Sequence, residues 1–168
     1  MKILRKLTVA FLLLFVTMNA TAQSKIAHIE IQALISEMPE FKEAQAQIEK
    51  LQKTYATELD ASMKELQTKF QTYSADGQNQ TDVTNAARQK ELAGMEQNIQ
   101  QYQQTAAQDV QKKSNDLYRP IIEKAREAIQ KVARAQGFDY VMDASQGQPL
   151  ILFDGKDLME DVKKELGF

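Results

Sequence analysis

Residues 40–75, EFKEAQAQIEKLQKTYATELDASMKELQTKFQTYSA, decide the fold. Their apolar side chains recur every three or four residues, which is the spacing of one face of an α-helix. Lys, Glu and Gln fill most other positions, so only a narrow apolar seam remains for packing against a second helix. The seam advances by about 3.56 residues per step, which keeps it on one face with little supercoil. Its members are Phe41, Ala44, Ile48, Leu51, Tyr55, Leu59, Met63, Leu66, Phe70 and Tyr73.

The two ends of this helix carry clear signals. Pro39 suits the first helical turn because its missing N–H needs no partner there. Residues 74–80, SADGQNQ, interrupt the pattern with turn-forming residues, and Gly77 offers a conformation with positive φ. Helical spacing then resumes at Thr81, a capping residue, and continues to about Gln136. We therefore expect the chain to reverse near Gly77 and to form an antiparallel helical hairpin.

The second helix is longer than the first. A partner that matches the first helix ends near Asp116, and Pro120 lies just beyond it. Proline inside a helix removes a backbone hydrogen bond, so a kink is expected there. Residues 121–135 are then expected to form a separate helical segment that packs on the rest of the fold. Residues 40–117 are expected to form an arm about 54 Å long.

Short strands are expected near both ends of the chain. Residues 24–31 and 138–143 alternate apolar and polar side chains, and residues 150–153, LILF, form a continuous apolar run. A short helix is expected from Leu158 to Leu166. The predicted fold class is α+β: the hairpin arm is inserted into a small β body made of residues 23–39 and 118–168.

A sheet of three short strands is marginally stable alone, and its open edges would invite aggregation. We therefore expect the strands to be completed by oligomerisation with copies of the same chain. The predicted interface residues lie on or beside the expected strands. They are Ile29, Ile31, Tyr140, Met142, Ile151 and Phe153.

The first 22 residues have the layout of a secretory signal peptide. Three basic residues precede the apolar run 7–18, and the small residues ATA follow at 20–22. About 12 apolar residues are too few for the roughly 20 that a membrane-spanning helix needs, which disfavours an uncleaved anchor. Cleavage after Ala22 would give a product outside the cytoplasm with no stable membrane insertion. Without ATP there, any work on other proteins must use binding energy.

Composition excludes several function classes. The 168 residues include 21 basic and 23 acidic side chains, so there is no basic excess for a nucleic-acid partner. There is no cysteine and one histidine, His28, which leaves no nucleophilic triad or metal cluster. The six glycines are too widely spaced for a phosphate-binding loop. We therefore expect no enzymatic activity, no metal and no cofactor.

Four features together resemble the Skp/OmpH family of periplasmic chaperones. They are the export signal, the strand opening KIA at 25–27, the polar helical hairpin, and GFDYVMDA at 137–144 before a final strand and helix. The resemblance covers essentially the whole mature chain. It implies a homotrimer whose strands build a central barrel and whose three arms enclose a cavity. It also implies that unfolded outer-membrane proteins are held there, in the periplasm, without ATP.

The charge of the arm differs from that of the arms of this family. Its best-known members have basic arms that attract acidic clients and lipopolysaccharide, whereas residues 40–117 here carry 9 basic and 12 acidic side chains. Lipopolysaccharide binding is therefore not carried over, and contact with apolar patches of clients is favoured. The alternative is a structural or adaptor coiled-coil protein of the cell envelope. The predicted client-binding residues, most of which also belong to the seam, are Tyr55, Leu59, Met63, Leu66, Phe70, Tyr73, Met95, Ile99 and Tyr102.

Overall fold

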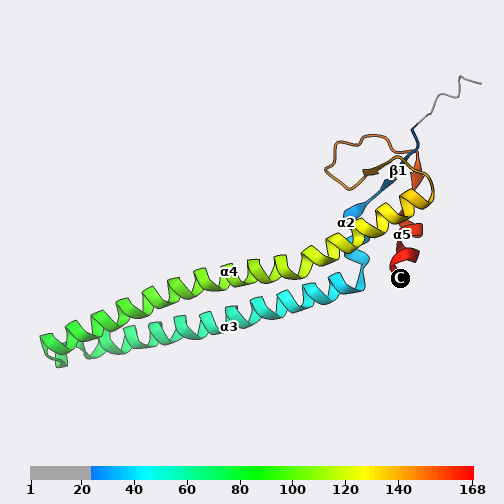
Figure 1. Ribbon diagram of the computed structural model, residues 1–168. Coiled ribbons are helices and arrows are strands. Elements are labelled where there is room, and N and C mark those ends of the chain that lie inside the picture. Colours follow the sequence, from blue (N-terminus) through cyan, green and yellow to red (C-terminus); the bar gives the residue numbers. More distant parts are fainter. Residues whose placement is uncertain (1–23) are drawn as a thin grey trace, which may run out of the picture.

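The computed structural model describes residues 24–168, so the predicted signal peptide lies outside the described residues. Figure 1 shows a long two-helix arm that leaves a small body containing the strands and the last helix. None of the helices in the described part of the chain combines the length and apolarity that a membrane span requires. The elements are β1 (Ile26–Ile29), α2 (Ile31–Glu37), α3 (Pro39–Asp76), η1 (Gly77–Asn79), α4 (Asp82–Ala135), β2 (Tyr140–Asp143), β3 (Lys156–Asp157) and α5 (Met159–Leu166).

The helical hairpin predicted from the seam is confirmed. Helix α3 begins at Pro39, and α4 runs back beside it (Figure 1). Thr81 caps α4, since its side chain accepts a hydrogen bond from the Thr84 amide at 3.2 Å. The positive φ expected at Gly77 is wrong. Gly77 has φ −59° and ψ −35°, and the chain reverses through the 3₁₀ turn η1.

The separate helical segment expected after Pro120 is also wrong, because α4 continues through this proline as one helix. The fixed φ of proline suits a helix, and packing on both sides of Pro120 offsets the lost hydrogen bond. Before it, α4 lies along α3; after it, Ile121, Ala125 and Ile129 are buried in the body. The expected packing of residues 121–135 on the body is therefore confirmed.

The three strands form one parallel sheet in the order β2-β1-β3. Ala27 and Ile29 of β1 point into the core and are buried, whereas Ile26 on the opposite face is exposed. The first strand is shorter than expected, because Ile31 begins α2 instead of continuing β1. The predicted strand at 150–153 is wrong as well: these residues have no regular structure, and the third strand is Lys156–Asp157.

One hydrophobic core joins the body to the base of the arm. Leu34, Met38, Leu158 and Val162 are fully buried there, together with small residues of α4. At the base of the arm, the ring of Phe41 in α3 stacks on that of Tyr118 in α4, with centroids 5.0 Å apart. The arm is thus anchored in the body core and not attached by a linker.

A polar contact explains why β1 stops before Ile31. The Asp143 carboxylate accepts hydrogen bonds from the Ile31 amide at 3.4 Å and from the Ser145 amide and hydroxyl at 2.9 and 2.6 Å. The Ser145 hydroxyl in turn accepts from the Gln32 amide at 3.1 Å. Side chains at and just after the end of β2 therefore accept hydrogen bonds from the first amides of α2. A helix has no internal partner for its first amides.

We expect Asp143→Ala to lower the free energy of unfolding by about 1–3 kcal/mol, because it leaves these donors without a partner. Burial tends to raise the pKa of Asp143, but the hydrogen bonds from Ser145 and Ile31 outweigh it, and the pKa lies below its ordinary value. This stabilisation is therefore present above the unfolded-state pKa of about 4 and is lost as the pH falls through the folded-state value. Urea unfolding of both proteins at pH 7 and pH 3 measures the difference.

The matched control is Asp154→Ala, because this carboxylate is exposed and accepts no hydrogen bond from the described residues. It should leave the midpoint unchanged at both pH values. An equal loss of stability in the two variants would contradict the role assigned to Asp143.

Candidate functional site

Tyrosines hold the two arm helices together in the middle of the seam. The Tyr55 hydroxyl on α3 donates to Asp109 on α4 at 2.7 Å, and the Tyr102 hydroxyl on α4 donates to Glu58 on α3. The two rings meet edge to face, with centroids 5.7 Å apart. The hydrogen bond to Glu58 raises the pKa of Tyr102 to about 12, so its hydroxyl stays protonated at neutral pH. Both tyrosines were predicted to bind clients, and the structure places them between the helices.

A group of polar contacts around Arg88, which we call the Arg88 clasp, links α3 to α4 at the far end of the arm. The Arg88 guanidinium pairs with Asp76 at 3.1 Å and lies 4.6 Å from the centroid of the Tyr73 ring. Glu91 accepts from the Tyr73 hydroxyl at 2.7 Å and from Lys69 at 2.5 Å. These contacts hold the pKa values of Asp76 and Glu91 below their ordinary values. Tyr73, the third tyrosine predicted to bind clients, thus also links α3 to α4.

Three apolar side chains stand out from the arm surface. Met63 is 51% exposed and Phe70 is 59% exposed, although both belong to the periodic seam. Val83, in the first turn of α4, is 80% exposed and was not among the predicted client-binding residues. Its place in the first turn of α4, next to the reversal of the chain, is the signal that sequence reasoning missed.

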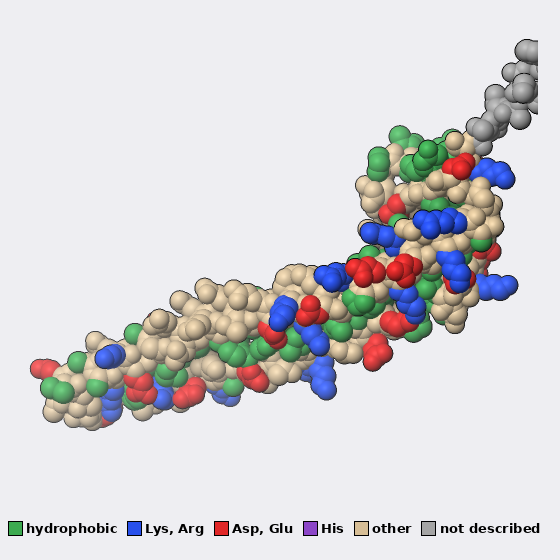
Figure 2. Space-filling view, viewed as in Figure 1, with side chains coloured by type: hydrophobic (Ala, Val, Ile, Leu, Met, Phe, Trp, Pro, Cys, Tyr) green, Lys and Arg blue, Asp and Glu red, His purple; other side chains and the backbone are tan. Residues whose placement is uncertain are grey.

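The remaining predicted client-binding residues are half-buried between the helices. Leu59, Met95 and Ile99, with Tyr102, line a groove of about 330 Å³ between α3 and α4. Leu66 of the seam is half-buried as well. On the face of the arm seen in Figure 2, basic and acidic side chains are interspersed and form no continuous field of one sign. The arm therefore offers separated apolar contacts on a polar surface of mixed charge.

The outer face of the sheet is the second apolar surface. Tyr140, Met142 and Phe153, all predicted interface residues, are exposed there, and Ile151 is 97% exposed beside them. The Phe153 ring lies 5.0 Å from the ring of His28 on β1. An apolar hollow of about 250 Å³ runs between β1, β2 and the 150–155 segment.

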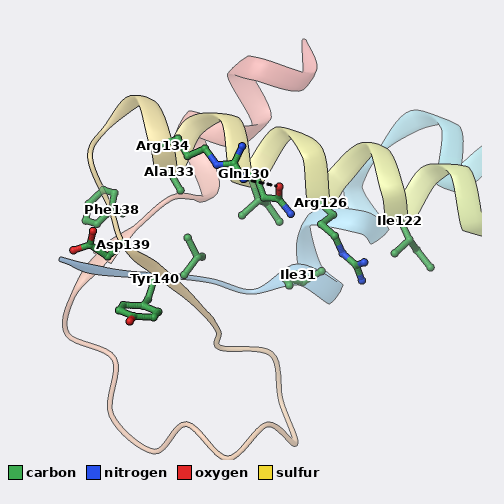
Figure 3. Close-up of a pocket in the computed structure, with 11 residues that line it drawn as sticks. Ile31, Ile122, Arg126, Gln130, Ala133, Arg134, Phe138, Asp139 and Tyr140 are labelled. Atoms are coloured by element: carbon green, nitrogen blue, oxygen red, sulfur yellow. Dashed lines mark hydrogen bonds between the residues drawn. The ribbon is translucent and has the colours of Figure 1, made fainter. Parts of the chain in front are cut away.

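The six predicted interface residues do not all lie on the outer face of the sheet. Ile29 is fully buried in the core of its own chain, so its side chain is not available to a second copy. Ile31 lies on the other side of the sheet, in a groove of about 430 Å³ between β2 and α4. Figure 3 shows this groove with Arg126, Gln130 and Arg134 extending from α4.

No metal site is formed by the described residues: within 24–168, no three His, Cys, Asp or Glu side chains gather closely enough to hold an ion. Several carboxylates of the arm instead pair with lysine, arginine or tyrosine on the opposite helix, among them Asp76, Glu91 and Asp109. The arrangement is thus suited to surface contact.

Comparisons with known proteins agree with this architecture. Residues 25–166 match the family model described as Outer membrane protein (OmpH-like). A Chaperone protein Skp from Pectobacterium atrosepticum is 24% identical over 155 residues, covering 92% of this chain and 93% of its own. The Chaperone protein Skp from Yersinia enterocolitica is 26% identical over 149 residues, covering 88% and 90%.

A solved structure shows the same fold. It is described as an OmpH-like outer membrane chaperone from Caulobacter crescentus, with a TM-score of 0.75 and 14% identity. The alignment covers 88% of this chain and 86% of that one. The relatives are named as chaperones, a non-enzymatic class, which agrees with the prediction that this chain is not an enzyme. Because the family model spans nearly all of the described residues, the chain belongs to the OmpH-like outer membrane protein family.

Proposed function

We propose that this protein is an ATP-independent holdase chaperone of the periplasm, which binds unfolded outer-membrane proteins between the arms of a homotrimer. The observation that carries this proposal is the arm itself. It is a long two-helix projection, rooted in the body core, whose surface presents Met63, Phe70 and Val83 among side chains of both charges. The chaperone names of the relatives support the same function.

The exposed apolar residues suit a client that has lost its fold. Each contact removes some apolar area from water, at about 25 cal/mol per Å², so a single contact is weak. Many such contacts along several arms would hold a chain while leaving each contact free to break. The tyrosine links and the Arg88 clasp keep the arm helices paired, so their seam does not have to open for binding.

The outer face of the sheet supports the proposed assembly. Ile151, Leu152 and Phe153 are apolar, exposed and without a strand partner among the described residues of their own chain. An exposed apolar run and an open sheet edge are both features that association with further copies would cover. We place the subunit interface on this face, around Tyr140, Met142, Ile151 and Phe153.

Suppression of aggregation tests the proposed function. An unfolded outer-membrane barrel protein is diluted from urea in the presence of the mature chain, and light scattering is followed. A holdase should suppress scattering at a stoichiometric ratio of trimer to client without ATP. A structural or adaptor coiled coil of the envelope would leave the scattering unchanged, and that result would refute the proposal.

Salt dependence distinguishes apolar from charge-driven client binding. Because the arm has 9 basic and 12 acidic side chains, it has no net positive charge with which to attract acidic clients. We therefore expect affinity for an unfolded acidic barrel protein to change little, or to rise, as salt increases past physiological strength, where the Debye length is about 8 Å. Titration at low and high salt measures this. A hundredfold loss of affinity would show that local basic clusters dominate.

A further inference from the structure

The groove of about 330 Å³ between α3 and α4, which we call the arm groove, has polar contacts at both of its ends. At the end nearer the body, the Tyr102 hydroxyl donates to Glu58. At the far end, Lys69 pairs with Glu91 at 2.5 Å. These contacts fix the two helices on either side of the groove, so an occupant does not have to separate them. The groove lies on the arm, away from the sheet on which we place the subunit interface (Figure 1).

Apolar side chains form one part of the lining, and two of them interact well with aromatic rings. Leu59 and Ile99 contribute aliphatic surface, whereas Met95 contributes a thioether and Tyr102 a ring. All four residues are half-buried. Contacts between sulfur and a ring, and edge-to-face contacts between two rings, both add to the free energy gained by burial alone. An aromatic side chain therefore gains more in this groove than an aliphatic side chain of the same area.

The size and the charge of the groove suit an uncharged ring. An apolar cavity of about 150 Å³ can hold benzene, so about 330 Å³ is sufficient for an aromatic side chain with part of its backbone. The lining residues carry no net charge, because Lys69 and Glu65 are its two charged members and lie 3.5 Å apart. The exposed amide of Asn98 can donate hydrogen bonds to the backbone of a bound segment and accept them from it.

A glycine inside α4 is a second indication that this part of the arm is a binding site. Gly94 lies one helical turn before Asn98 and therefore on the same side of α4. Glycine is less favourable inside a helix than any residue except proline. Packing does not require it here, because a Cβ at this position would have no neighbour within 4 Å. A side chain at position 94 would lean over the preceding turn, which carries Glu91, so its absence leaves the far end of the groove open.

The proposed clients carry aromatic side chains at regular places. The strands of outer-membrane barrels have girdles of aromatic residues at both membrane interfaces. Before the barrel forms, these rings are not yet covered by lipid or by neighbouring strands. A site that accepts one ring and its adjacent backbone can therefore be used repeatedly along one client.

We propose that the arm groove binds aromatic side chains of unfolded outer-membrane proteins, one ring at a time. The site deepens the proposed holdase function and rests on it. Met63 and Phe70 are exposed on the arm and do not line the groove, so they remain available for other apolar parts of the same client. The groove would thus give the arm a preference for apolar segments that contain an aromatic residue.

A tryptophan peptide tests the groove directly, because the protein contains no tryptophan. The probe is the blocked peptide Ser-Thr-Gly-Trp-Gly-Thr-Ser, whose fluorescence is followed as the mature chain is added. Two peptides with Phe or cyclohexylalanine at the central position then compete with the probe. Their apolar areas are similar but only Phe is aromatic, so we expect the Phe peptide to bind about two- to tenfold more tightly.

Variants locate the site. Ser62→Leu fills the groove from α3, because Ser62 belongs to its lining, and should weaken binding of the probe at least tenfold. Gly94→Leu covers the far end of the groove and should weaken binding at least threefold. The matched control is Thr68→Leu at an exposed position of α3 outside the groove, which should leave binding unchanged. The hydroxyls of Ser62 and Thr68 both donate to the carbonyl four residues earlier, so the two substitutions remove the same kind of contact.

Leucine is a better helix former than serine, glycine or threonine, so all three variants should keep the arm helical, and circular dichroism checks this. Two results would overturn the proposal. The first is equal binding of the probe to the wild type, Ser62→Leu and Gly94→Leu. The second is equal competition by the Phe and cyclohexylalanine peptides, which would show that the site does not distinguish aromatic from other apolar side chains.

The aggregation assay keeps this proposal separate from the proposed function. A wild type that suppresses aggregation but does not bind the probe contradicts the arm groove alone. A wild type that fails to suppress aggregation contradicts the holdase function.

Discussion

Removing the arm should abolish client protection and leave a folded body. We expect this of a variant that lacks residues 49–113, with a short Gly/Ser linker joining Ile48 to Ser114. The three large exposed apolar side chains of the arm, Met63, Phe70 and Val83, are then lost. A linker of a few residues is sufficient, because the axes of packed helices lie about 8–10 Å apart.

The structure indicates where this cut should be made. The body core includes Ala44 of α3 and extends to the stacked rings of Phe41 and Tyr118, so these residues must stay. Ile48 is also buried and is kept. The tyrosine links and the Arg88 clasp lie wholly within the deleted part, so their removal leaves no unpaired partner in the body.

Light scattering of a urea-diluted barrel protein measures the result, and circular dichroism and native mass check that the body is folded and assembled. The variant should give no protection at any ratio at which the wild type is effective. A matched variant with the arm intact carries Gln97→Ser and Gln104→Ser, at exposed polar positions, and should protect fully. Full protection by the armless body would place the client contacts elsewhere and contradict the proposed role of the arm.

The parts of the fold that sequence could predict are those set by local periodicity. The recurrence of apolar residues from Phe41 to Tyr73 predicts α3, and the turn-forming residues that follow it predict the reversal. Both follow from the geometry of one helix face and need no knowledge of distant contacts. The long arm was predictable for this reason.

The errors arose where distant residues decide the local structure. Strand β1 ends early because Asp143 and Ser145, more than a hundred residues away, satisfy amides at the start of α2. Helix α4 continues through Pro120 because both of its neighbouring segments are packed. The contact of Asp143 with α2 leaves no mark in the sequence around Ile31. The packing of residues 121–135 was predictable from their periodicity, but not that it keeps α4 continuous through Pro120.

Only part of the candidate site was predictable, because periodicity describes one helix and not its contacts with the other. Periodicity identifies Tyr55, Tyr73 and Tyr102 as residues of the seam, but it does not show that each hydroxyl has a carboxylate partner on the opposite helix. Nor does it distinguish exposed members of the seam, such as Phe70, from half-buried ones such as Leu66. That distinction depends on how the two helices are rotated against each other.

The wrong strand prediction at residues 150–153 bears on the proposed assembly. Its composition predicts a strand, whereas the single chain leaves it irregular with Ile151 almost fully exposed. A strand-forming sequence without a strand partner is the expected state of a segment that pairs only between subunits. We therefore infer that residues 150–153 become ordered against another copy when the chains associate.

The substitution Ile151→Asp should consequently separate the subunits without unfolding them. At 97% exposure the new carboxylate is fully hydrated in the free subunit, so the fold of a single chain should not change. In the assembly the same carboxylate would be buried in an apolar interface with no cation to pair with. The effective penalty for such a charge is several kcal/mol, and each subunit would carry it.

Native mass measurement over a range of concentrations shows the outcome, with circular dichroism as the check on folding. The wild type should have the mass of three chains and Ile151→Asp that of one. The control Gln148→Asp adds the same charge to the same exposed loop, three residues away, and should remain assembled. Ile29→Asp provides the opposite contrast: its side chain is fully buried within the chain, so this change should unfold the body itself. A wild type with the mass of one chain, or an Ile151→Asp variant that stays assembled, would show that the outer face of the sheet is not the subunit interface.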